Sequence, residues 1–79
     1  MKLPRDLSGR ELVKLLCRNW GYQAVEQEGS HIVVTTENPS HQRMAIPDHP
    51  ALRVGTLNNI LRAVAAHHGV EREDILRRR

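Results

Sequence analysis

The sequence predicts an α+β fold with the element order α-β-β-β-α. Two segments, near residues 8–20 and 56–69, carry apolar residues at helical spacing, and a run rich in β-branched residues lies between them. The loops between the predicted strands are too short for parallel crossovers, so we expect a three-stranded antiparallel sheet. Both helices must bury their apolar stripes, which favours a two-layer sandwich with two helices on one face of the sheet. A chain of 79 residues is expected to form one domain over residues 1–79.

The first helix is expected to begin at Ser8. Ser8 and Glu11 have the spacing of a capping box, in which two side chains satisfy backbone N–H groups at a helix start. Gly21 stands where a helix commonly ends. The polar side carries a cation every fourth residue, which is usual for a solvated helix face and also compatible with an RNA-contacting stripe. The apolar stripe is Leu12, Leu15, Leu16 and Trp20, and the cations are Arg10, Lys14 and Arg18.

The three strands are predicted over residues 22–27, 31–36 and 43–46, the last ending at Pro47. The second is the clearest, because it is mostly β-branched, and Glu28-Gly29-Ser30 before it has turn composition. Side chains alternate along a strand, so one face carries His31, Val33 and Thr35 and the other Ile32, Val34 and Thr36. Both faces are partly apolar, which suggests that a partner covers the face turned away from the helices.

The second helix is expected to follow Thr56, a residue type that commonly caps a helix N-terminus. Its apolar residues recur at the spacing of an amphipathic helix, and Gly69 is expected to end it. The tail over residues 70–79 is predicted to add a helical turn from about Glu71. Ile75 and Leu76 would pack back onto the domain. The apolar stripe consists of Leu57, Ile60, Leu61, Val64 and Ala65.

The composition permits a nucleic-acid partner without requiring one. Lys and Arg number 12 against 9 Asp and Glu, a net charge of +3 that the three residues Arg77 to Arg79 supply. The only cysteine, Cys17, cannot form an internal disulfide and is expected to be a small apolar helix residue. The charged N-terminal segment lacks the apolar stretch of a signal peptide, and no apolar run is long enough to span a membrane. We therefore expect a cytoplasmic protein without a membrane partner.

Histidine is the main chemical resource, because the chain holds five and lacks other site patterns. Adjacent helical residues such as His67 and His68 point about 100° apart and do not readily chelate one metal ion. No paired carboxylates and no glycine-rich phosphate loop are present, so neither a metal nor a small-molecule cofactor is expected. His31 differs from the others because it follows Gly29-Ser30 and opens the clearest strand. An imidazole held there can exchange protons near neutral pH, although such a histidine is more often a simple surface residue.

Four short motifs, in this order along the chain, resemble the HicA (YcfA-like) family, small toxin ribonucleases of bacterial and archaeal toxin–antitoxin systems. The motifs are Gly21-Tyr22, Gln27-Glu28-Gly29-Ser30-His31, Ile46-Pro47-Asp48-His49 and Gly55-Thr56-Leu57-Asn58-Asn59-Ile60-Leu61. The resemblance covers about residues 8–69 and leaves residues 70–79 as a C-terminal extension. It implies a fold like that of double-stranded-RNA-binding domains, an mRNA-cleaving activity (mRNA interferase) and a HicB-type antitoxin that covers the active face.

The resemblance places the catalytic histidine of this family on His31. That residue would act without metal, as general base on a ribose 2′-OH or as general acid on the leaving 5′-oxygen. The sequence departs from the family where Glu26 replaces a usually basic residue and where Ile32 replaces a frequent second histidine. The candidate RNA-binding residues are the turn residues Gly29 and Ser30, the cations Lys14, Arg43, Arg53 and Arg62, and Thr56 with the backbone N–H groups of its helix start.

Two other interpretations remain open from the residues. Each candidate cation is also an ordinary solubilising charge, and His31 could touch phosphate without cleaving it. The chain would then be a non-catalytic double-stranded-RNA-binding module. A protein-interaction domain without RNA affinity is the third interpretation, and it would lack salt-dependent RNA binding.

Overall fold

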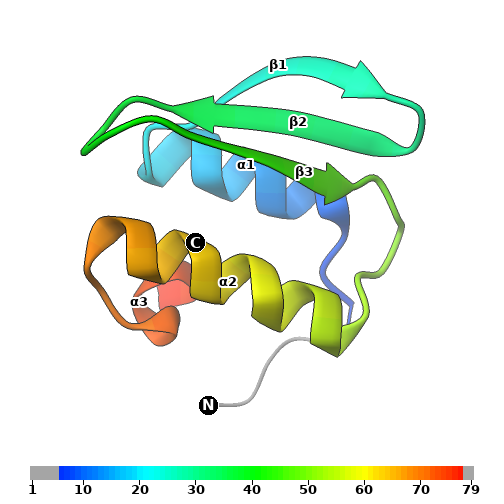
Figure 1. Cartoon of the computed structure of the whole chain (residues 1–79). Coiled ribbons are helices and arrows are strands. Elements are labelled where there is room, and N and C mark those ends of the chain that lie inside the picture. Colours follow the sequence, from blue (N-terminus) through cyan, green and yellow to red (C-terminus); the bar gives the residue numbers. More distant parts are fainter. Residues whose placement is uncertain (1–5, 78–79) are drawn as a thin grey trace.

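A computed structural model describes residues 6–77, and residues 1–5 and 78–79 lie outside the described part. The N-terminal charges Lys2 and Arg5 and the last two of the three C-terminal arginines are therefore not described. The order of elements confirms the predicted α+β fold and adds a short third helix (Figure 1). The elements are α1 (Gly9–Asn19), β1 (Gln23–Glu28), β2 (His31–Thr36), β3 (Gln42–Pro47), α2 (Val54–His68) and α3 (Arg72–Arg77).

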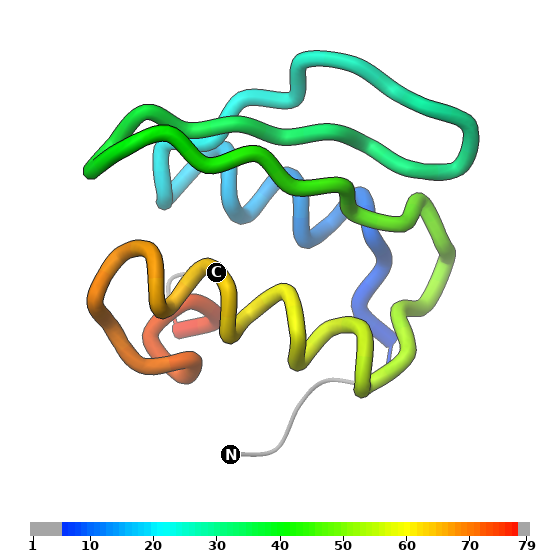
Figure 2. The backbone as a smooth tube through the Cα atoms, viewed as in Figure 1, coloured from blue at the N-terminus to red at the C-terminus, as the bar shows by residue number. Residues whose placement is uncertain are grey.

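The sheet is the predicted antiparallel meander. Its order is β1-β2-β3, with β2 paired to both neighbours. The register between β1 and β2 shifts at Val25, which is left without a partner in a β-bulge. The helices α1 and α2 lie on one face of the sheet and run in the same direction, as the tube view also shows (Figure 2). The prediction of a three-stranded sheet covered on one face is therefore confirmed.

The first helix begins and ends as predicted. The Ser8 hydroxyl accepts from the Glu11 N–H at 3.0 Å, and the Glu11 carboxylate accepts from the Ser8 N–H at 3.0 Å, which completes the capping box. After the helix, Gly21 has a φ of 75°, a conformation that glycine adopts without steric cost. The chain therefore turns directly from α1 into β1.

The second helix starts earlier than predicted, so the assignment of Thr56 as its N-cap is wrong. The helix begins at Val54, and Arg53 is the N-cap, with extended backbone angles and no side-chain cap hydrogen bond. The first turn closes when the Leu57 N–H donates to the Arg53 carbonyl at 2.9 Å, which places Thr56 inside that turn. Gly69 ends the helix in the left-handed conformation, as predicted.

The core lies between the sheet and the helices, and α3 closes one end of it. Cys17 is half-buried against this core, close to the prediction of an apolar helix residue. The Trp20 indole N–H donates to the Ile75 carbonyl at 3.4 Å, so the C-terminal turn packs back as predicted. The fully buried side chains include Leu12, Leu16, Val34, Ile46, Leu57, Leu61 and Ile75.

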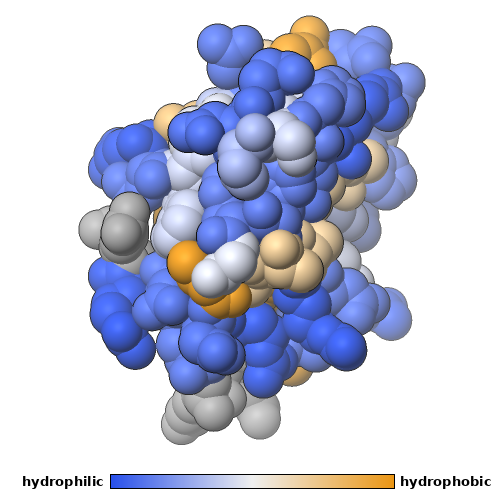
Figure 3. Space-filling view, turned by 60° about the vertical axis from the view of Figure 1, so that its left-hand side comes forward, coloured by the Kyte–Doolittle hydropathy of each residue, from blue (hydrophilic) through white to orange (hydrophobic). Residues whose placement is uncertain are grey.

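A cluster of aromatic and histidine side chains lies at the same end as α3. The His68 ring contacts the rings of Trp20 and Tyr22, at centroid distances of 5.2 and 5.6 Å. Burial raises the pKa of Tyr22 to about 12, and burial together with the neighbouring His67 lowers the pKa of His68. Figure 3 brings this end of the molecule forward and shows a mostly hydrophilic surface with small separate apolar spots.

A close approach between two backbone segments lies at the other end, where α1 starts against the end of β3. A Cβ atom added to Gly9 would lie 1.8 Å from the carbonyl oxygen of Pro47. We therefore expect Gly9→Ala to destabilise the protein by at least about 2 kcal/mol, because overpacking commonly costs ~1–3 kcal/mol and here a backbone carbonyl must move. Urea denaturation followed by circular dichroism measures the change.

The matched control is Gly55→Ala in the first turn of α2, where an added Cβ meets no atom within 4 Å. That substitution should be neutral or stabilise the protein by up to about 1 kcal/mol, because alanine is the better helix former. Equal stability of the two variants would contradict the close approach at Gly9.

Candidate functional site

The candidate catalytic residue His31 is the first residue of β2 and is exposed. It is paired with Glu28 of β1 on one side and with Pro47 of β3 on the other. The turn before it contains Gly29, whose φ of 59° favours glycine, and Ser30, and both are exposed. His31 therefore projects from a strand paired on both sides and stays open to solvent.

Three of the other histidines make side-chain contacts elsewhere. His41 Nδ1 lies 2.7 Å from Glu37 Oε2. His67 Nε2 lies 2.8 Å from the Ser40 carbonyl oxygen, and His68 Nε2 lies 3.2 Å from the Tyr22 hydroxyl. Within residues 6–77, no hydrogen bond or ion pair occupies the side chains of His31 and His49. The structure thus leaves the imidazole of His31 available for a ligand.

A group of four residues, the Asp48 clasp, holds the turn before His31; it consists of Arg10, Gln27, Ser30 and Asp48. The Asp48 N–H donates to the Ser30 carbonyl at 2.7 Å. The Asp48 carboxylate accepts from Arg10 Nε at 3.0 Å and Nη2 at 3.3 Å, and from Gln27 Nε2 at 3.3 Å. These bonds join the start of α1, the end of β1, the turn and the end of β3.

Sequence reasoning did not identify this clasp. Asp48 and Gln27 occur in the motifs that carry the family resemblance, but nothing in the sequence indicates that they meet Arg10. Asp48 directly follows Pro47, which pairs with His31, and this nearness to His31 is the only hint of its role that the sequence offers. The partner Arg10 lies 38 residues away, which one sequence without relatives does not reveal.

The clasp also shifts the pKa values of its two charged residues. The hydrogen bond and charge of Arg10 hold the pKa of Asp48 below its ordinary value, and Asp48 raises the pKa of Arg10 in return. The Arg10 side chain is 71% exposed, against 18% for Asp48. Because the Arg10 partner is so open to solvent, the ion pair adds little to folding stability.

The candidate Arg43 shares the outer face of the sheet with His31 but is already ion-paired. Its Nη2 lies 2.8 Å from Glu26 and 3.6 Å from Glu28. Val33, between Glu26 and Ala45 in the sheet, is fully buried although it faces away from the helices. Side chains of this chain therefore cover the central apolar residue of that face and neutralise the charge of Arg43.

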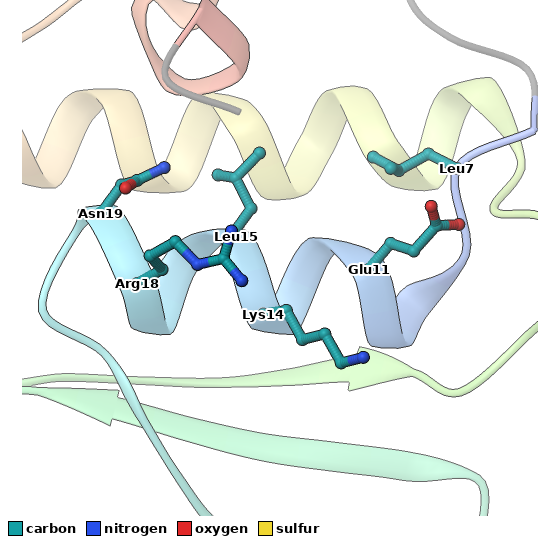
Figure 4. Close-up of a pocket in the computed structure, with 6 residues that line it drawn as sticks. All are labelled: Leu7, Glu11, Lys14, Leu15, Arg18 and Asn19. Carbon is teal, nitrogen blue, oxygen red and sulfur yellow. The ribbon is translucent and has the colours of Figure 1, made fainter.

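The candidate Lys14 lies on the other side of β1. It lines a groove between α1 and β1 together with Val13, Val25 and Gln27, and it also borders a shallow pocket along α1. In Figure 4, the Lys14 side chain points toward the sheet, whereas Glu11 points toward Leu7. No carboxylate of residues 6–77 lies within ion-pair distance of Lys14. Its charge is therefore available to an anion.

The remaining candidates lie on α2. Arg53 and Thr56 belong to the start of this helix, at the same end of the molecule as the β1–β2 turn (Figure 1). Arg62 is exposed farther along α2, in the helical layer, and the structure does not bring it to the outer face that carries His31. The candidates thus form a group at the turn (Gly29, Ser30 and His31), with Lys14 and Arg43 on opposite faces of the sheet.

No three His, Cys, Asp or Glu side chains within residues 6–77 are placed to hold a metal ion together. None of the helices described there has the length and apolar character that crossing a bilayer requires.

Comparison with protein families shows the family to which this chain belongs. A family model described as the HicA toxin of bacterial toxin–antitoxin systems matches residues 9–65, from the start of α1 into α2. The chain belongs to the HicA toxin family. It is therefore a toxin component, and a toxin–antitoxin system implies an antitoxin partner. No curated protein and no solved structure matches the chain.

The structure shows what surrounds Glu26 and Ile32, the two residues at which the sequence departs from the HicA pattern. Glu26, where a basic residue is usual, forms the ion pair with Arg43. Ile32, where a second histidine is frequent, is half-buried against the core and lines the groove beside α1. A side chain at position 32 thus lies on the opposite sheet face from His31.

The electrostatics of the clasp can be measured directly. In Arg10→Ala, the pKa of Asp48 should rise toward its ordinary value of 3.8, because the strongest interaction that favours the carboxylate is removed. Since the folded pKa lies below 3.8, the interaction favours the folded protein above that pH and is lost as the pH falls through the lower folded value. The ¹³C shift of the Asp48 carboxyl during a pH titration reports the change.

Arg43→Ala is the matched control, because it removes an arginine whose partners are Glu26 and Glu28. It should leave the titration of Asp48 unchanged. An Asp48 titration that is the same in Arg10→Ala and in the unaltered protein would contradict the clasp.

Proposed function

We propose that this HicA toxin is a metal-independent endoribonuclease that cleaves mRNA with His31. The observation that carries the proposal is an exposed histidine, free of side-chain partners within residues 6–77, at the start of a doubly paired strand. Histidine is the side chain whose ordinary pKa suits proton transfer near neutral pH. The family match supports a toxin whose target is RNA.

The proposed reaction is a transesterification within the RNA strand. The ribose 2′-oxygen attacks the adjacent phosphorus, and the bond from phosphorus to the 5′-oxygen of the next nucleotide breaks. The 2′-OH proton passes to a base, and the leaving 5′-oxygen gains a proton. The products are a 2′,3′-cyclic phosphate and a 5′-OH end. His31 serves as the base or as the acid, and one such proton transfer contributes about 10²–10⁴-fold in rate.

The turn and Lys14 are the proposed contacts to the RNA backbone. Gly29 and Ser30 are exposed directly before His31, so a phosphate can approach the backbone there. Lys14, like Arg53 and Arg62, has no described carboxylate within ion-pair distance, and of these three cations it is the one that lines the groove beside β1. Because Glu26 and Glu28 engage Arg43, that residue contributes less in this chain than a free arginine would. Arg53, Thr56 and Arg62 remain candidates with smaller support.

The proposed antitoxin is of the HicB type and covers the face that carries His31, and the proposed location of both proteins is the cytoplasm. The support is the family match together with the exposure of His31, which a bound protein would remove. A non-catalytic RNA-binding module is the alternative, and the cleavage assay below decides between the two.

His31→Ala should abolish cleavage of an RNA transcript in the presence of EDTA, with a loss of at least about 10²-fold, since a general acid–base group is removed. The measurement is gel analysis of the transcript and mass spectrometry of the product ends. His41→Ala is the matched control, because this exposed histidine in the β2–β3 loop pairs with Glu37 far from the turn. It should cleave like the unaltered protein.

Intact RNA with the unaltered protein, bound in a salt-dependent manner, would replace the proposal by the binding module. Cleavage that requires added Mg²⁺ would overturn metal independence. Equal cleavage by His31→Ala and the unaltered protein would exclude His31 as the catalytic residue.

RNA affinity should respond in opposite directions to two charge changes. Lys14→Ala should weaken binding several-fold and reduce the slope of log affinity against log salt by about 0.7–0.9, the loss of one phosphate contact. Glu26→Gln should strengthen binding several-fold, because it removes a negative charge and releases Arg43 from its 2.8 Å ion pair. Fluorescence anisotropy with a labelled, non-cleavable RNA measures both.

Glu73→Gln removes the same negative charge from α3 and serves as the control for net charge. The double variant Glu26→Gln with Arg43→Ala should lose most of the gain. If Glu73→Gln strengthens binding as much as Glu26→Gln, the effect is one of net charge and the role assigned to Arg43 is wrong.

A further inference from the structure

We propose that Asp48 and Arg10 are positioning residues that fix the turn carrying His31 and so set the rate of cleavage. The inference rests on the proposed function of His31. It adds two residues that make no described hydrogen bond or ion pair with His31 and that act through the backbone of the turn.

The first step is the place of the clasp in the sheet. His31 is paired with Pro47, and Asp48 follows Pro47 directly. The hydrogen bond from the Asp48 N–H to the Ser30 carbonyl, at 2.7 Å, is thus the last one between these two strands before the chain leaves the sheet. It ends on the residue before His31. A shift of Asp48 therefore moves the backbone of Ser30, one residue before the candidate catalytic side chain.

The second step is the closure of the turn from β1. Gln27 Nε2 lies 3.4 Å from the Gly29 carbonyl and 3.3 Å from Asp48 Oδ2, so this one side chain connects the turn to the clasp. The turn is otherwise open, since an added Cβ at Gly29 would meet no atom within 4 Å. Packing at Gly29 therefore does not hold the turn, and besides the pairing of Glu28 with His31 these polar contacts are what connect it to the rest of the protein.

The third step separates positioning from stability. The start of α1 is attached to the same loop by a backbone bond from the Gly9 N–H to the His49 carbonyl, at 3.0 Å. The capping box and the buried stripe of α1 do not involve Arg10. Loss of the Arg10–Asp48 pair thus leaves the helix attached and the core intact, while the turn loses its side-chain connection to α1.

The test is Asp48→Asn, which keeps the backbone N–H and the size of the side chain but removes the charge that Arg10 binds. We expect kcat for RNA cleavage to fall about 10–100-fold, because small misplacements of a catalytic group cost that much. KM should change less than threefold, and the thermal midpoint should stay near that of the unaltered protein. Backbone ¹⁵N relaxation should show increased motion confined to Gly29, Ser30 and His31.

The matched control is Asp74→Asn in α3, which breaks the 3.2 Å pair with Arg77, whose side chain is 71% exposed like that of Arg10. It should leave kcat unchanged. The exchanged pair Arg10→Asp with Asp48→Arg should recover part of the lost kcat, which a purely local defect at position 48 would not do.

Each outcome separates the two proposals. Cleavage retained in His31→Ala overturns the proposed function, whatever Asp48 does. Cleavage lost in His31→Ala but unchanged in Asp48→Asn overturns the positioning role alone. A loss of kcat in Asp48→Asn that matches the fraction of unfolded protein also overturns it, because the clasp would then act through stability. Reduced kcat with an unchanged midpoint and a mobile turn supports it.

Discussion

The arrangement of the site depends on the close approach of α1 to the end of β3. N–H groups at a helix start lack partners within the helix, and here the Gly9 N–H finds the His49 carbonyl at 3.0 Å. Only glycine fits at this contact, since a methyl group would lie 1.8 Å from the Pro47 carbonyl oxygen. A second backbone bond, from the Leu52 N–H to the Leu7 carbonyl, holds the preceding segment. With the two elements fixed, Arg10 is placed beside Asp48, and β3 ends opposite His31.

The two ends of the molecule differ in character: one is packed and largely apolar, and the other is polar and exposed. At one end, Trp20, Tyr22 and His68 pack together over α3, and Ile75 is fully buried. At the other end, the contacts around the β1–β2 turn are polar and open to solvent. Buried apolar area supplies most of the stability of a small domain, whereas exposed ion pairs add little. The turn that carries His31 is therefore free to be shaped for a ligand, because the fold does not rely on it.

The sequence predicted the elements well because their signals are local. Ser8 with Glu11, Gly21 and Gly69 each mark a helix boundary through contacts within a few residues, and the β-branched run gave β2 its bounds. The start of α2 was misplaced because Arg53, which has no capping side chain, gives no signal there. The histidine came from the resemblance rather than from composition. The clasp and the pairing of Arg43 with Glu26 were not predicted, since each joins residues distant in sequence.

The placement of charges indicates how an RNA strand would reach His31 under the proposed function. The outer sheet face holds Glu26 and Glu28 around Arg43, so a polyanion gains little by lying across it. The uncompensated charge of Lys14 lies on the α1 side of β1, whereas His31 belongs to the outer face. A strand that contacts both must pass around the β1 edge of the sheet, and the β1–β2 turn is the part of that edge nearest to His31. That turn presents the small residues Gly29 and Ser30, which leave room for the sugar–phosphate backbone. The substrate path and the anchoring of the turn thus meet at the same two residues.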